Sequence, residues 1–152
     1  MKQQQFNSTQ SGFTLVELVV VIVILGILAA TALPRFVSLT NEARSASVNG
    51  MAGGLRSAVG LVQARFFAVG TNTSPVTMVD GTTVAVSTTT GIPTGTAAGI
   101  GNALQSIDGY ATPTYASATA VIFKPTNGGN DTTCVALYNG TTGAVTVNTS
   151  TC

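Results

Sequence analysis

The sequence predicts an α+β protein in which a long N-terminal helix packs on a C-terminal antiparallel β-sheet. From Phe13 to Leu33 the chain is apolar almost throughout. From there to Phe66 apolar residues recur about every three or four positions, as on one face of an amphipathic helix. Beyond Gly70 the composition shifts to Thr, Gly, Ser, Asn and Val in short β-forming runs. We therefore expect four parts: a polar leader at 1–12, a membrane-spanning helix at 13–34, an amphipathic continuation of that helix at 35–66 and a β-rich head at 67–152.

The first apolar run has the length of a membrane span. At about 1.5 Å per residue, the run from Phe13 to Leu33 makes a helix of roughly 30 Å, which is the thickness of the hydrocarbon core. Valine and isoleucine crowd residues 19–24, but a lone strand in lipid leaves its backbone unpaired, so a helix is favoured. The alternative, a buried strand or core helix of a soluble protein, fits such a long continuous run poorly. Pro34 closes the segment and weakens or bends the turn before it.

The segment carries a single charge, Glu17, four residues after Phe13. An unpaired charge in lipid is costly and marks function by default. So close to the start, the carboxylate can sit near the headgroups, and the helix dipole favours a negative charge there.

The second half of the helix is expected to cover the apolar face of the sheet. Its expected apolar positions are Phe36, Leu39, Ala43, Val48, Met51, Leu55, Val59, Val62 and Phe66. Its glycines, Gly50, Gly53, Gly54 and Gly60, weaken a helix by about 1 kcal/mol each against alanine. Small residues also allow close helix packing, and the sequence leaves both interpretations open.

The head is expected to be an antiparallel sheet of four or five strands. Residues 76–79 and 82–86 flank Asp80 and Gly81, and an Asp-Gly pair between β-forming runs indicates a hairpin. Residues 87–99 are expected to be loop and 100–107 a short helix. Further strands are expected at 120–124, 134–139 and 144–148, with a turn from Gly140 to Gly143.

The composition excludes several classes of function. Only 7% of residues are charged and the net charge is +1, so no specific nucleic-acid partner is predicted. Histidine is absent, which removes the commonest general base and transition-metal ligand. With no clustered carboxylates or nucleotide-binding loop, we expect no enzyme, cofactor or metal site. Asp131 is the least improbable calcium ligand.

The two cysteines, Cys134 and Cys152, lie in the last fifth of the chain. An even pair at the end of a chain that enters a membrane predicts one disulfide in an oxidising compartment. Two free thiols in a reducing compartment are the alternative. A bridge would close a loop of under twenty residues, worth about 3 kcal/mol in the chain-entropy model.

The run Gly12-Phe13-Thr14-Leu15-Val16-Glu17-Leu18 resembles the processing motif of class III signal peptides, which belongs to type IV pilins and type II secretion pseudopilins. The short polar leader with an early Lys2, the apolar helix and Pro34 extend this resemblance. The ALPRF sequence and the sheet ending in cysteine are similar to the mannose-sensitive haemagglutinin (MSHA) type of major pilin. The leader departs from many pilins in having one basic residue.

The resemblance implies a type IVa-like pilin fold and a filament subunit. A prepilin peptidase would cut after Gly12 and the new amine of Phe13 would be methylated. The subunit would wait in the inner membrane as a single-pass protein with its head in the periplasm. Assembly machinery in that membrane would then add it to a helical homopolymer, an extracellular pilus for adhesion or motility.

Within that frame, Glu17 is expected to pair with the Phe13 amine of a neighbour as the helix enters the filament core. Losing one partner of a buried pair typically costs about 3–5 kcal/mol, so the pair would set axial register. Pro34 either ends the membrane segment or marks where the helix opens during assembly. A type II secretion pseudopilin or a minor pilin is the alternative function.

Overall fold

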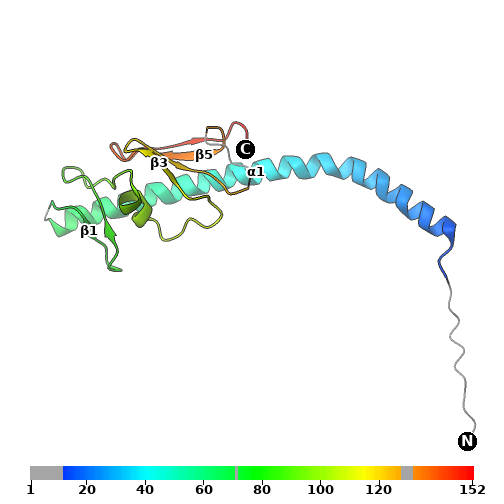
Figure 1. The fold of residues 1–152 in the computed structure, drawn as a ribbon, viewed down its shortest axis with the longest axis horizontal. Helices are drawn as coiled ribbons and strands as arrows, with labels where there is room; N and C mark the ends of the chain where they lie inside the picture. Colours follow the sequence, from blue (N-terminus) through cyan, green and yellow to red (C-terminus); the bar gives the residue numbers. More distant parts are fainter. Residues whose placement is uncertain (1–11, 71, 128–131) are drawn as a thin grey trace, which may run out of the picture. The chain divides into compact units, whose positions relative to one another are not determined.

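The computed structural model describes residues 12–70, 72–127 and 132–152, and of residues 33–38 it describes the backbone alone. The chain forms two compact units that divide between Leu39 and Thr40. One helix, α1 (Leu15–Val69), supplies the first unit and continues into the second. The other elements all belong to the second unit, the head (Figure 1). The predicted α+β class is confirmed.

Helix α1 extends three residues beyond the predicted end at Phe66 and starts two residues after Phe13. It runs through Pro34 without a break in its helical backbone. The last turn of α1 is followed by Gly70, whose φ is +68°. A glycine at positive φ just past a helix is a common terminator because it has no Cβ to strain.

In the head, α1 buries one narrow stripe against the rest of the unit. The buried positions follow steps of four and three, which keep them on one helix face: Val48, Ala52, Leu55, Val59, Val62 and Phe66. The expected stripe was wrong at its start, because Leu39 and Ala43 are exposed and Met51 is half-buried beside a buried Ala52. Apolar packing on the head therefore begins at Val48.

The four-stranded sheet lies along the second half of α1 (Figure 1). Its strands are β3 (Thr114–Ser117), β4 (Ala120–Phe123), β5 (Val135–Tyr138) and β6 (Val145–Asn148), paired antiparallel in that order. The register opposes Val121 to Tyr138 and Phe123 to Ala136, and these four side chains are buried in one cluster with Val48, Ala52, Leu55 and Val59 of the helix. Alternate residues of β4 therefore lie on the face of the sheet that packs against α1, because successive side chains of a strand point to opposite faces.

Tyr138 is the largest fully buried side chain of the head. Its hydroxyl donates to the Pro93 carbonyl oxygen at 2.6 Å, and burial raises the pKa of the phenol well above its usual range. The hydroxyl thus stays protonated and serves as a donor that ties β5 to the loop before the helical turn.

A second, smaller cluster lies at the end of α1. Val62 and Phe66 pack with Val76, Val84 and Val86, which come from the two-stranded sheet of β1 (Val76–Thr77) and β2 (Thr83–Val84) and the residues after it. The expected hairpin is present, but its turn differs. Met78 and Thr82 are bonded at 2.8 Å, so the loop has three residues and ends at Gly81 with φ +87°, a common three-residue hairpin geometry.

Two other expectations about the head were wrong. The short helix expected at 100–107 begins and ends earlier: a π-helical turn over Ala97–Gly101, capped by Thr96, is followed by helical residues Asn102 and Ala103. The Gly99 amide donates to Thr96 Oγ1 at its start, and Ile100 is buried. The strands form two sheets rather than one. Strand β3 was not predicted, because as an edge strand it is mostly exposed and shows no apolar alternation.

Candidate functional site

Glu17, the single charged residue of the apolar segment, lies in the first turn of α1. Gly12, Phe13 and Thr14 precede the helix, and Glu17 is its third residue. Phe13 is 89% exposed within the subunit, so its ring is available to another surface.

Thr14 and Glu17 form a capping box. The Glu17 amide donates to Thr14 Oγ1 at 3.2 Å. In return, Glu17 Oε2 accepts from the Thr14 amide at 3.1 Å and from its hydroxyl at 3.0 Å. These bonds satisfy amides that have no partner inside the helix and fix the carboxylate beside the residue that follows Phe13.

Thr14 is the functional residue that the sequence reasoning missed. The signal was present, because Thr-x-x-Glu directly before an apolar run is the sequence pattern of a capping box.

The helix after the box has no apolar cover within the described chain. Residues Leu15–Ala32 have a mean hydropathy of 2.8 and none of the window is buried. By length and composition this helix can cross a membrane. Outside lipid, the same surface would require a protein partner.

The disulfide between Cys134 and Cys152 is present, with a sequence separation of 18 and a Cα–Cα distance of 4.8 Å. It ties the end of the described chain to the start of β5. Both cysteines are buried in the main cluster.

Three arginines of α1 bind the head through its backbone. Arg44 Nη1 donates to the Cys152 carbonyl oxygen at 2.9 Å, Arg56 Nη2 to that of Val145 at 3.0 Å, and Arg65 Nε to that of Thr77 at 3.1 Å. Such charge-assisted bonds are stronger than neutral ones. Arg44, Arg56 and Arg65 are therefore points at which α1 is attached to the rest of the head.

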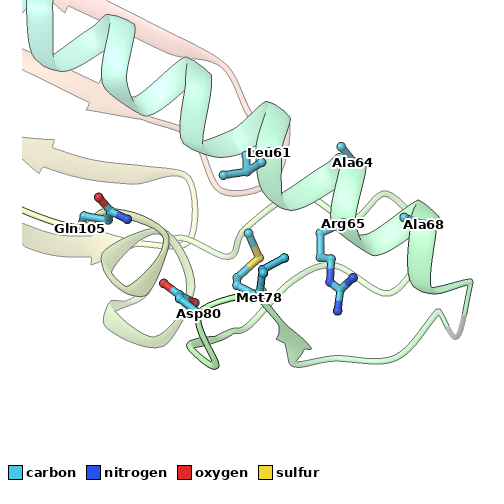
Figure 2. Close-up of a pocket in the computed structure, with 8 residues that line it drawn as sticks. Leu61, Ala64, Arg65, Ala68, Met78, Asp80 and Gln105 are labelled. Carbon is cyan, nitrogen blue, oxygen red and sulfur yellow. The ribbon is translucent and has the colours of Figure 1, made fainter.

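A groove of about 480 Å³ lies between the end of α1 and the β1–β2 hairpin (Figure 2). It is lined by Leu61, Ala64, Arg65, Ala68, Met78, Val79, Asp80 and Gln105. Val79, at the hairpin tip, is 91% exposed. The groove offers apolar contact area, and its two charged side chains are engaged locally, Arg65 with Thr77 and Asp80 with the Thr82 amide.

Within residues 12–70, 72–127 and 132–152, no three His, Cys, Asp or Glu side chains gather as a metal site. Asp131, the calcium candidate of the sequence, lies outside the described residues.

The N-terminal segment matches a known family model. The model is described as the prokaryotic N-terminal methylation motif, and it matches residues 7–33, which include Gly12, Phe13 and Glu17. The N-terminal segment therefore carries the sequence pattern of this methylation motif.

Similar proteins are named as major components of type IV pili. The chain is 55% identical over 56 residues to the type IV narrow pilus major component PilA5 of Thermus thermophilus. These 56 residues are 36% of this chain and 48% of the relative. The chain is 49% identical over 53 residues to the type IV major pilin protein PilE1 of Neisseria gonorrhoeae (35% and 32%). It is 49% identical over 45 residues to the type IV major pilin protein PilA of Myxococcus xanthus (30% and 20%).

The alignments thus span less than half the length of these pilins. No solved structure matches the chain significantly. The likeness to type IV pilins is carried by a shared segment, and the matched methylation motif contains the capping box and the exposed apolar helix.

Proposed function

We propose that this chain is the structural subunit, the major pilin, of a type IV pilus. The observation that carries the proposal is the exposed apolar helix that begins with a capped carboxylate inside the methylation motif. The named relatives are filament components, which supports a structural role rather than an enzymatic one.

The proposed sequence of events starts at the leader. A prepilin peptidase removes residues 1–12 by cutting after Gly12, and the amine of Phe13 is methylated. The apolar helix holds the subunit in the inner membrane with its head in the periplasm until the assembly machinery transfers it to the filament. In the filament, other copies replace lipid as the cover of residues 15–32.

Glu17 has two oxygens for two tasks. In the subunit, the bonds to Thr14 use Oε2. Oε1 can then accept from the cationic Phe13 amine of a neighbouring copy without loss of the cap. Since an unpaired charge in an apolar core is costly, this pair would fix where each helix stops along its neighbours.

The first test is chemical analysis of protein sheared from the surface of cells that express the chain. The proposal predicts a product that begins at methylated Phe13 and is two hydrogens lighter than the dithiol form. A processed chain that stays with the cells and is never sheared off would contradict a major pilin and favour a pseudopilin or minor pilin.

Two substitutions distinguish the role of the Glu17 charge from the role of Glu17 in capping the helix. Glu17→Gln keeps an acceptor at the capping position, whereas Glu17→Ala removes both functions. We expect both variants to be inserted and cleaved, and both to lose filament yield by more than about 100-fold, as loss of a buried charge pair implies. Glu42→Gln, an exposed acid on the same helix, is the matched control and should assemble normally. Normal filaments from Glu17→Gln would leave only the capping role.

A further inference from the structure

The last residues of the described chain lie against the first turns of α1 in the head. Residues 149–152 and the helix residues Asn41, Glu42 and Ser45 together line a hollow of about 230 Å³. The two segments border each other across this hollow, and Cys152 packs in the main apolar cluster together with Val48. Before Val48, the helix is linked to the rest of the head by polar bonds.

Arg44 supplies such a bond. Its Nη1 donates to the Cys152 carbonyl oxygen at 2.9 Å across 108 positions of sequence, and the side chain is half-buried. One turn later, the Ser47 hydroxyl bonds the Tyr110 hydroxyl at 2.8 Å. Apolar burial of the helix starts after both, at Val48.

The acceptor of Arg44 is a backbone atom, so its position depends on what holds residue 152. Cys152 is bonded covalently to Cys134, next to the first residue of β5. The Thr151 amide also donates to the Thr133 carbonyl oxygen, at 3.4 Å, and Asn148 Nδ2 donates to that of Thr132 at 2.6 Å. Without the disulfide, the short segment after β6 would be held to the residues before β5 by hydrogen bonds such as these two, and not by a covalent link.

We propose that residues 149–152 form a strap that is locked by the disulfide and that holds residues 41–47 of α1 on the head through Arg44. Arg44 is a positioning residue, and the disulfide acts on the helix through it. The disulfide thus stabilises the fold, and it also holds the helix residues that precede the apolar stripe, 41–47, on the head. This role holds whether or not the chain forms filaments.

Amide hydrogen exchange of the full oxidised chain in detergent micelles tests the strap. Residues 41–47 lie inside α1, and local opening of this helix segment breaks its backbone hydrogen bonds, so a lost attachment appears as faster exchange of these amides. For Arg44→Gln we expect amides 41–47 to exchange about tenfold faster or more, as loss of a bond to a charged donor implies. Arg56→Gln is the matched control, because Arg56 makes the same kind of bond to the Val145 carbonyl. It should leave amides 41–47 unchanged.

The link to the disulfide is tested by combining variants. Replacing both Cys134 and Cys152 by serine should accelerate the same amides, and adding Arg44→Gln to that variant should accelerate them no further. Unchanged exchange in Arg44→Gln, or accelerations that multiply in the combined variant, would overturn the proposal. If the serine variant does not fold, the comparison of Arg44→Gln with Arg56→Gln in the oxidised chain still decides.

Discussion

At the scale of single residues, polar side chains in this protein act through backbone atoms. Thr14 and Glu17 satisfy the amides of the first helix turn, and the arginines of α1 bind backbone carbonyls of the head. The charged side chains of Glu17, Arg44 and Arg56 thus each bond a backbone atom. The carboxylate of Asp80 is a further example, because its Oδ1 accepts from the Thr82 amide at 2.9 Å inside the hairpin loop.

Asp80 should make the hairpin sensitive to acid. The hydrogen bond from Thr82 lowers the pKa of the Asp80 carboxyl below its usual value, so the carboxylate stabilises the folded turn above the unfolded-state pKa of about 3.9. This stabilisation is lost as pH falls through the lower, folded-state pKa. We expect the Thr82 amide proton shift to titrate by NMR with a midpoint below about 3.9.

Asp80→Asn is the control for that titration. Asparagine keeps an oxygen acceptor but carries no titrating group, so the Thr82 shift should become insensitive to acid. A midpoint at or above the ordinary value in the unaltered chain would show that the bond does not hold the turn.

At the scale of elements, glycines play opposite roles in the helix and in the turns of the sheet. A Cβ on helical Gly60 would meet nothing within 4 Å. A Cβ on Gly140, after β5, would lie 2.6 Å from Gly95 Cα and 2.7 Å from the Ala118 carbonyl oxygen. The first glycine is thus dispensable to the isolated subunit, and the second permits three chain segments to meet.

Alanine at the two positions should therefore have opposite effects. Gly60→Ala should stabilise the isolated subunit by about 1 kcal/mol through helix propensity. Gly140→Ala should destabilise it by about 1–3 kcal/mol, because backbone must move to admit the methyl group. Urea unfolding followed by circular dichroism measures both, and equal effects of the two changes would contradict this assignment. A loss of filaments in Gly60→Ala with a stable subunit would instead indicate that another helix approaches there.

At the scale of the whole molecule, the core lies entirely in the second unit. Among the described residues, the buried apolar side chains start at Val48, whereas no residue of Leu15–Ala32 is buried. The first unit thus contributes an apolar surface and little to the stability of the head. The two units differ in this way because only the second can bury its apolar side chains without a partner molecule.

A chain of residues 40–152 should accordingly fold alone. We expect it to stay in the aqueous phase, keep the disulfide and unfold cooperatively, with a Tm within about 5 °C of the head of the full chain because the same core is retained. Calorimetry and detergent-phase partitioning check both properties. A truncated chain without a cooperative transition would show that residues before Thr40 support the core.

Much of the fold could be predicted from the sequence. The features concerned depend on residues that are close together in the chain, or on how a segment partitions between water and lipid. The apolar length of residues 15–32 specifies a membrane-competent helix, and Asp80-Gly81 specifies a hairpin. The run Gly12 to Leu18 indicated a resemblance to type IV pilins, and the methylation motif matches there. The Thr14 cap could be predicted from the same residues. Each pattern is recognisable without knowledge of the tertiary structure.

Other features were decided only by the tertiary structure. Arg44, Arg56 and Arg65 find carbonyl oxygens, which every residue carries and no sequence pattern marks. Likewise, β3 becomes a strand because β4 offers it an edge, although its own residues show no alternation. The sequence by itself determined which segments would be helix, apolar surface and cross-link, since these follow from local physics. Which atoms the head uses to hold the helix depended on contacts between distant segments, which form only when the whole unit packs.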